Sequence, residues 1–108
     1  MTVEQLSSIG QFNILCMPEP EREVDGVYIG DLLSWVMGKA ECDNVWITIM
    51  SNINVIAVAS LSDVSCVLLA ENVTLDTDVL NTAKEKGINI LSTELSAYEA
   101  AVKVSGMI

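Results

Sequence analysis

Five polar residues stand directly after apolar segments of this sequence, where their hydroxyl, amide and carboxylate groups could bind a small polar ligand. They are Ser51, Asn52, Glu71, Asn72 and Thr93. Apolar segments of this length are typical of strands, and ligands of open α/β sheets bind outside the carboxyl ends of the strands. The free N–H groups of a helix that starts after Thr93 would also suit an anion. These five residues are therefore the candidate ligand-binding site.

The same residue types have a second, purely structural use, because Ser, Thr and Asn cap the N-termini of helices. Ser51 or Asn52 could cap a helix that follows, and Thr93 could cap the last helix of the chain. In addition, the carboxylate of Glu71 makes the site less favourable for a phosphate. Capping and ligand binding both remain open from the residues alone.

The sequence lacks the residues on which most catalytic sites depend. It contains no histidine, which excludes Ser-His-Asp and Cys-His nucleophilic catalysis and imidazole metal sites. Its six glycines fall into neither of the phosphate-binding patterns G-x-G-x-x-G and G-x-x-x-x-G-K-[ST]. No carboxylate has a sequence context that marks it as a catalytic acid or base. We therefore expect no enzyme, no catalytic residue, no metal and no cofactor.

The three cysteines, Cys16, Cys42 and Cys66, lie in separate segments and form no C-x-x-C pair. This spacing excludes a zinc knuckle and a thioredoxin-like motif. Cys16 and Cys66 lie in apolar segments, where thiols usually pack inertly, so Cys42 in a polar segment is the only candidate for a reactive thiol. The segment that begins at Met1 lacks the basic and apolar parts of a signal peptide. Reduced thiols in the cytoplasm are the expectation.

The first half of the chain predicts two short helices and three strands. The Thr2–Gln5 spacing of a capping box indicates a helix over 2–9. Strands are expected over 12–17, 27–29 and 45–50, with a charged, proline-containing loop over 18–23 and a helix that Asp31 caps before Gly38. The segment 45–50 (VWITIM) is almost continuously apolar, which is typical of a strand covered on both faces. Trp46 is therefore expected in the core, whereas Trp35 on the helix could face a partner.

The segment 53–61 fits two structures. As a strand it would form a hairpin with 45–50, but the Ser51-Asn52 turn lacks the Asn-Gly or Asp-Gly sequence that favours such hairpins. As a helix it would be capped by Ser51 or Asn52, and its alanines would pack closely on a sheet. The helix is the favoured alternative.

The second half predicts a regular alternation of strands and helices. A buried strand over 64–70 is followed by a helix over 77–86, with Asp76 as its cap and Gly87 as its end. A strand over 88–91 precedes a final helix, capped by Thr93, whose apolar face comprises Leu95, Tyr98, Ala101 and Val102. Strands that alternate with helices imply parallel pairing and right-handed crossovers. We expect one domain over 1–108 with a three-layer α/β/α fold and a mostly parallel central sheet.

The overall composition indicates which partners the domain could bind. Fifteen acidic residues against five basic ones give a net charge of -10, and the only cluster of cations is Lys84 with Lys86. Binding to nucleic acid or to an anionic membrane surface is therefore not expected. Hydrophobic residues make up 51% of the chain, more than a domain of this size readily buries. The excess predicts a partner surface, most simply a second copy of the chain.

Short sequence blocks in the order strand, helix, strand also resemble a known family. From about residue 24 onward the chain resembles the DRTGG domain, a module related to the N-terminal domain of HPr kinase/phosphorylase and also found beside CBS domains. The blocks that carry the resemblance are VYIGD (27–31), VWITIM (45–50), IAVASL (56–61), VLLAE (67–71), VLNTAKEKG (79–87), INILST (88–93) and ELSAYEAA (94–101). The resemblance implies the fold of that N-terminal domain and a regulatory rather than catalytic function.

The residues that give the family its name are largely replaced. Family members carry Asp-Arg where this chain has Ser51-Asn52, and Thr-Gly-Gly where it has Ala70-Glu71-Asn72; only the hydroxyl of Thr93 resembles a later polar position. The missing Arg and glycines are groups that approach anions well. Without an attached kinase or CBS pair, this copy is expected to act on other chains.

Two functions are therefore predicted. The first is a non-catalytic regulatory or protein-interaction module, homodimeric and bound to a protein partner whose identity the sequence does not give. The alternative is a sensor domain that binds a nucleotide or an acidic metabolite at the carboxyl ends of the strands.

Overall fold

A five-stranded sheet lies at the centre of the computed structural model, which describes residues 1–108. The strands lie in the spatial order β1 (Phe12–Cys16), β5 (Ile90–Thr93), β4 (Cys66–Leu69), β3 (Asn44–Thr48) and β2 (Gly26–Ile29). From β2 to β5 all neighbouring pairs are parallel, and β1 alone runs antiparallel, beside β5. The predicted mostly parallel sheet is confirmed, and β1 and β2 form its two edges.

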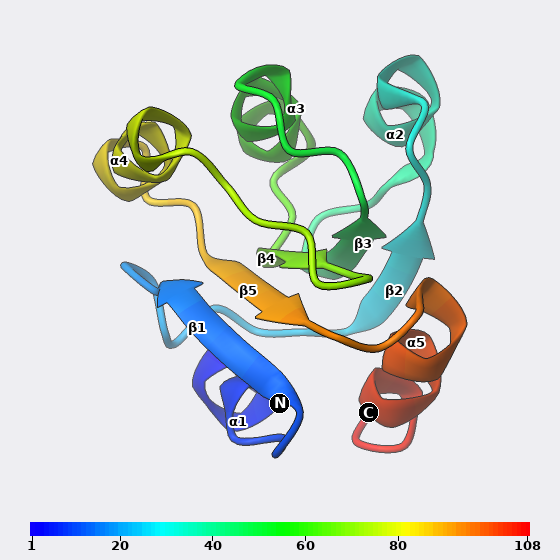
Figure 1. Cartoon of the computed structure of the whole chain (residues 1–108). Coiled ribbons are helices and arrows are strands. Elements are labelled where there is room, and N and C mark those ends of the chain that lie inside the picture. The colour runs from blue at the N-terminus through cyan, green and yellow to red at the C-terminus, as the bar shows by residue number, and fades with distance from the viewer.

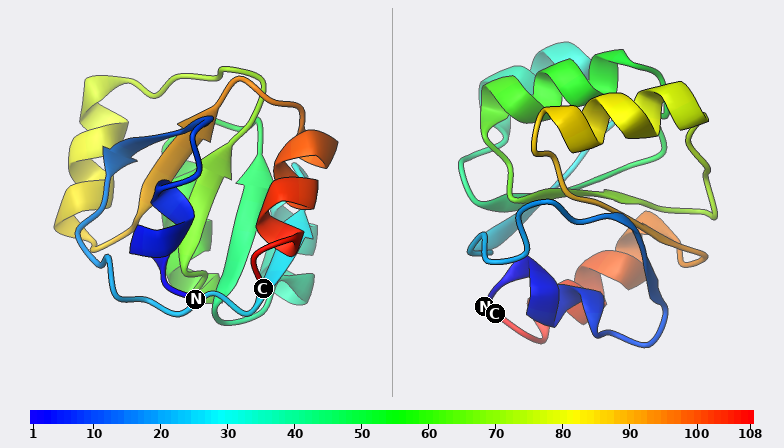
Figure 2. Two further views of the ribbon diagram at one scale, coloured as in Figure 1. Left: turned by 90° about the horizontal axis from the view of Figure 1, so that it is seen from below. Right: turned by 90° about the vertical axis from the view of Figure 1, so that its left-hand side faces the viewer.

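The helices cover both faces of this sheet (Figure 1). Three of them, α2 (Leu33–Lys39), α3 (Asn54–Ser62) and α4 (Thr77–Glu85), lie on one face. The other two, α1 (Val3–Ser7) and α5 (Ala97–Ser105), lie on the opposite face, which Figure 2 shows from the side. The three-layer α/β/α architecture expected from the sequence is confirmed. None of the helices has the length and apolarity that a bilayer crossing requires.

Two apolar clusters fill the space between the sheet and the helices. Trp46 belongs to the cluster on the side of α2, α3 and α4, and its neighbours Val45 and Ile47 belong to the cluster on the side of α1 and α5. All five residues of β3 are buried, because this strand is flanked by other strands and covered on both faces. Burial of one large apolar side chain stabilises a fold by about 1.5–3 kcal/mol, so the continuous apolar sequence of β3 is a main source of stability.

The ambiguous segment after β3 is a helix, as favoured from the sequence. The side-chain Oδ1 of Asn52 accepts the backbone N–H of Asn54 at 2.9 Å, which satisfies one free donor at the start of α3. The helix ends at Asp63, whose φ of 55° lies in the left-handed region. The hairpin alternative is therefore wrong.

Three of the predicted helix caps are wrong. The N-cap of α3 is Ile53, without a side-chain cap hydrogen bond, and not Ser51 or Asn52. Asp31 does not cap α2; its Oδ1 accepts the Thr48 hydroxyl at 2.7 Å and the Ile49 N–H at 3.0 Å, so it joins the end of β2 to the end of β3. Thr93 does not cap α5, because that helix begins later, with a capping box between Ser96 and Glu99. By contrast, the capping box between Thr2 and Gln5 is present in α1.

The buried face of α5 differs from the face predicted from the sequence. Ala100 and Val104 are buried against the sheet, whereas the predicted core residues Tyr98 and Val102 are exposed. The predicted face takes Leu95 as its first position, but Leu95 precedes α5, so its spacing from Tyr98 and Val102 does not define a helix face. Two large apolar side chains of α5 consequently face solvent.

The loop between β1 and β2 is held in place by two polar residues. Asn89, at the start of β5, exchanges hydrogen bonds with the backbone N–H and carbonyl of Glu19 and also donates to the Ser65 carbonyl. The guanidinium of Arg22 contacts Asp43 and Asp63, each at 3.1 Å. These contacts fix the path of the chain from one edge of the sheet to the other.

Candidate functional site

The five predicted site residues lie along one edge of the sheet, at the carboxyl ends of three adjacent strands. Ser51 and Asn52 follow β3, Glu71 and Asn72 follow β4, and Thr93 is the last residue of β5. The strand order β5-β4-β3 places these segments in sequence along that edge. The expectation that the strand ends bring them to one side of the molecule is met, although each residue has a different environment.

Thr93 is inside the structure rather than on its surface. Its side chain is 1% exposed. The hydroxyl donates to the Gln11 carbonyl at 2.8 Å and accepts the Leu95 N–H at 3.2 Å. Both hydrogen-bonding functions of the hydroxyl are thus occupied, and Thr93 holds the start of β1 and the loop before α5 against the end of β5.

Glu71 and Asn72 form a tight turn that leaves their side chains free. Both have a φ of 58°, in the left-handed region that glycine adopts more readily than other residues. Their backbone N–H groups donate to the Leu95 and Thr93 carbonyls, each at 2.8 Å. Both residues are exposed. The turn therefore ties two strand-end loops together and presents one carboxylate and one carboxamide to solvent.

The segment after β3 adds one free hydroxyl to this edge. Ser51 and Asn52 are both exposed, and the side-chain oxygen of Asn52 accepts the Asn54 N–H, so Ser51 is the residue with a free side chain. Asp31 lies beside the start of this segment, because its carboxylate accepts the Thr48 hydroxyl and the Ile49 N–H. The edge as a whole carries hydroxyl, amide and carboxylate groups, which suit a polar ligand, and no cationic side chain among these residues.

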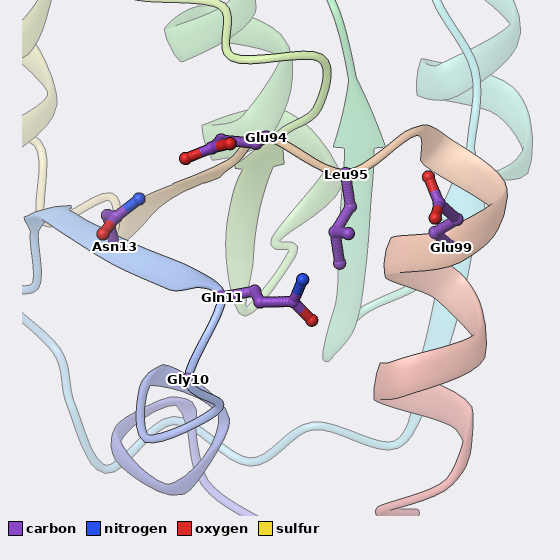
Figure 3. A pocket seen from close by; sticks show the side chains of 6 residues that line it. All are labelled: Gly10, Gln11, Asn13, Glu94, Leu95 and Glu99. Atoms are coloured by element: carbon purple, nitrogen blue, oxygen red, sulfur yellow. The ribbon is translucent and has the colours of Figure 1, made fainter.

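A shallow pocket of about 340 Å³ lies at the same end of β5 but on the side of α1 and α5. Its lining comprises Gly10, Gln11, Asn13, Glu94, Leu95 and Glu99 (Figure 3). None of the five predicted residues lines it. Figure 3 shows Glu94 at the end of β5 and Glu99 on α5, so the two carboxylates of the pocket come from different elements.

The electrostatics of this pocket disfavour anions. The Glu99 carboxylate accepts the Ser96 backbone N–H at 3.1 Å, and this bond, followed by the one with the Ser96 side chain, holds the pKa of Glu99 below its usual value. Glu99 is therefore ionised at neutral pH. The Ser96-x-x-Glu99 spacing of a capping box is a sequence signal for the position of Glu99. No sequence pattern indicates that Gln11 lines the same pocket as Glu99.

The cysteines do not form a reactive centre. Cys42 is exposed, but its thiol donates to Asp63 Oδ2 at 3.1 Å, and chiefly this hydrogen bond raises the pKa of Cys42 to about 11. Such a thiol is protonated at neutral pH, and the thiolate is the nucleophile. The raised pKa therefore speaks against the one candidate for a reactive thiol. Burial raises the pKa of Cys66 to about 12, in agreement with the packing role expected for that residue.

Comparison with known proteins places these features in a family. The model of the DRTGG domain matches residues 13–107. A similar solved structure is that of the CBS and DRTGG domains of the regulatory region of Clostridium perfringens pyrophosphatase, in complex with its activator diadenosine tetraphosphate. The two chains are 12% identical and superpose with a TM-score of 0.68, over 93% of this chain and 46% of the other. This chain thus spans about half the length of that neighbour, and the likeness shows a shared fold. No curated protein sequence matches the chain.

Proposed function

The chain belongs to the DRTGG domain family, and on that premise we propose that it is a non-catalytic regulatory module that binds other protein chains and forms a homodimer. The DRTGG domain of the solved neighbour is part of a regulatory region. The absence of histidine and of a glycine-rich phosphate loop supports a function without catalysis. Hydrogen bonds join the turn after β4 to the end of β5 and the loop that follows it. Loops held in this way suit a module that presents a fixed surface to a partner.

The observation that carries this proposal is the number of large apolar side chains on the surface. Twelve of them are 43% to 75% exposed, in a chain of 108 residues. Isolated apolar residues are normal on protein surfaces, but contiguous apolar area marks interaction sites. Trp35 and Tyr98 are among the twelve, and large aromatic residues are enriched where proteins bind each other. A protein partner, including a second copy, would remove this area from water.

Light scattering of the purified chain should give a mass of twice 11.7 kDa at micromolar concentration. Because each copy carries a net charge of -10, added salt should screen the repulsion and shift the dimer to lower concentrations. A dilution series at two salt concentrations is the control, since an aggregate would not dissociate to a single species of half the mass. A mass of 11.7 kDa at every concentration and salt would contradict the homodimer.

A second function, ligand sensing at the strand ends, is favoured by the turn after β4. Glu71 and Asn72 both adopt the left-handed conformation at the positions where the family resemblance places two glycines. Backbone strain of this kind concentrates at ligand-binding segments. The ligand would contact the side chains of Ser51, Asn52, Glu71 and Asn72, while Thr93 would position the adjoining loop. The regulatory region of the solved neighbour binds a dinucleotide activator, so nucleotides and acidic metabolites are the compounds to test.

A thermal-shift screen with these compounds tests the sensor function. A ligand present at 100 times its dissociation constant should stabilise the fold by about 2.7 kcal/mol. Asn72→Ala should reduce the shift, because it removes an exposed carboxamide without touching the core, and Asn81→Ala, on the exposed side of α4, is the matched control. If no compound shifts the melting temperature, or if Asn72→Ala leaves the shift unchanged, the strand ends are not the binding site.

A further inference from the structure

We propose that two copies of this chain pair through the edge strand β2, which lies antiparallel to the β2 strand of the second copy and joins the two sheets into one. This inference rests on the homodimer proposed above and specifies the surface that forms it. It depends on the character of the two sheet edges, on the groove beside β2, and on the distribution of charge around that groove.

The two edges of the sheet differ in how they are protected. At β1 the pairing with β5 shifts register between Ile14 and Cys16, and Pro18 follows shortly after the strand. Bulges and prolines are features that prevent edge strands from pairing with another chain. β2 pairs with β3 without a register shift from Gly26 to Ile29 and contains neither proline nor charge. Its outer side is therefore an unprotected edge.

A groove of about 500 Å³ runs along this open edge. Its lining comes from β2 and from α5, and comprises Gly26, Val27, Tyr28, Ile29, Ala101, Ser105 and Ile108. The small residues Ala101 and Ser105 leave room above the helix for an added strand. On α5, Tyr98 lies three positions before Ala101 and Val102 lies three positions before Ser105, so they continue the same helix face towards solvent. An added strand would thus lie in the groove with apolar side chains beside it.

The distribution of charge favours a second copy as the occupant. The chain carries fifteen acidic residues and a net charge of -10, so most pairs of surfaces on two copies repel each other. β2 and α2 contain no carboxylate, and the only charge of α2, Lys39, lies over the Trp35 ring at 4.4 Å from its centroid. The single carboxylate of α5, Glu99, lines the other pocket. The exposed Asp25 and Asp31 flank β2, but β2, α2 and α5 together carry one carboxylate and two lysines, so this surface repels its own copy less than the rest of the acidic chain does.

The exposed apolar side chains gather on the elements around the same edge. Eight of the twelve belong to β2, to α2 and its N-cap residue, or to α5 and the residues after it; they are Ile29, Leu32, Trp35, Met37, Tyr98, Val102, Met107 and Ile108. A two-fold axis that passes beside β2 pairs each element with its own copy, as isologous interfaces require. α5 would then pack against the second α5, and α2 against the second α2.

Two matched substitutions, one on each edge, test this arrangement. Ile29 on β2 and Ile14 on β1 have nearly equal exposed fractions of 48% and 51%. Ile29→Lys should weaken the dimer about 100-fold, because it places two like charges in the apolar groove of the interface. Ile14→Lys adds the same charge at the opposite edge and should leave the dimer unchanged. Sedimentation equilibrium over a concentration series measures the dimer dissociation constant of each variant, and circular dichroism verifies that each variant is folded.

Val102→Lys on α5 is a second variant whose side chain is half exposed, and it tests the same surface if Ile29→Lys does not fold. In the wild-type dimer, the backbone N–H groups of β2 that face away from β3 should exchange slowly, and in the Ile29→Lys monomer they should exchange fast. If the wild type is dimeric and all three variants remain dimeric, the β2 edge is not the interface, although the homodimer stands. If the wild type is monomeric at every concentration, both proposals fail and the edge is left to a strand of another protein.

Discussion

Replacing Asn89 by Asp is expected to lower the free energy of unfolding by about 3–5 kcal/mol at pH 7, the usual cost of an uncompensated buried charge. Asn89 is 1% exposed. Its Nδ2 donates to the Glu19 carbonyl at 2.7 Å and to the Ser65 carbonyl at 2.9 Å, while Oδ1 accepts the Glu19 N–H at 2.9 Å. The substitution keeps the shape of the side chain but removes both donors and turns a carboxylate towards two carbonyl oxygens.

The same substitution should make stability depend on pH with a definite sign. Burial and the two facing carbonyls favour the neutral form of the new carboxyl group, so its pKa in the folded protein is above its pKa in the unfolded chain. The loss of stability is therefore complete above the folded pKa and shrinks as the pH falls through it, because the protonated group can donate to one carbonyl. Urea unfolding at pH 7 and at pH 4, compared with wild type, measures the difference.

Asn81→Asp on the exposed side of α4 is the matched control for this prediction. It introduces the same charge at the surface, where a substitution usually changes stability by no more than about 0.5 kcal/mol. An Asn89→Asp protein as stable as the Asn81→Asp protein, or with a deficit that does not vary with pH, would show that the loop from Glu19 onward does not depend on this hydrogen-bonded side chain.

Trp46→Ala is expected to cost about 3–5 kcal/mol, because the indole fills the core on the side of α2, α3 and α4 and its removal leaves a cavity. The side chain is fully buried, and its Nε1 donates to the Gly30 carbonyl at 2.9 Å. Trp46→Phe keeps most of the apolar volume and loses the donor, so it should cost about 1–3 kcal/mol for the unsatisfied carbonyl. The two values separate the packing of the ring from the hydrogen bond that ties β3 to the end of β2.

Trp35→Ala provides the comparison, since Trp35 has the same side chain but is exposed on α2. At a concentration where the chain is monomeric, its removal loses little beyond the contact with Lys39, a cation–π interaction worth about 0.5–1 kcal/mol at an exposed site. Guanidinium unfolding, followed by circular dichroism, measures the free energy of unfolding of all three variants. Circular dichroism is used because each variant removes one of the tryptophans on which a fluorescence signal depends. Equal costs for Trp46→Ala and Trp35→Ala would mean that Trp46 does not anchor the core.

Most of the fold could be predicted from local sequence patterns. The apolar segment around Trp46 marked the central strand, and Gly87, with a φ of 71°, ended α4 as expected. Each of these signals depends on a few neighbouring residues, as does the capping box of α1. The alternation of strands and helices then determined the parallel sheet and its two layers of helices, because few topologies satisfy the rules for crossover connections.

The errors arose where two similar residues competed for one role. Thr93 and Ser96 both carry hydroxyls near the start of α5, and only Ser96 has a Glu three residues further on, which forms the capping box. A helix capped by Thr93 would include Leu95 in its apolar face, whereas α5 begins only at Ala97. Asp31 likewise has the residue type and position of a cap, but its carboxylate binds Thr48 on the neighbouring strand. A contact across the sheet has no signal in the local sequence.

The pocket beside β5 also could not be predicted from local sequence patterns. Gln11 and Asn13 come from the start of β1, and Glu94 and Glu99 come from the other end of the chain. They meet because β1 lies antiparallel to β5, a pairing that no local pattern indicates. The strand-end residues, in contrast, could be placed on one edge from the sequence, since the carboxyl ends of neighbouring parallel strands always lie together.

The pairing of β1 with β5 also has a consequence for synthesis of the protein. Of the five strands, β1 is the earliest in the chain and β5 the latest, and Phe12 lies opposite Thr93. A ribosome releases residues in order at about 5–20 residues per second. β1 therefore remains unpaired with β5 for several seconds while the intervening strands and helices emerge. A nascent chain that stops before Ile90 would leave β1 and one side of β4 open to intermolecular pairing. Translation must therefore run almost to the final helix before the sheet can close.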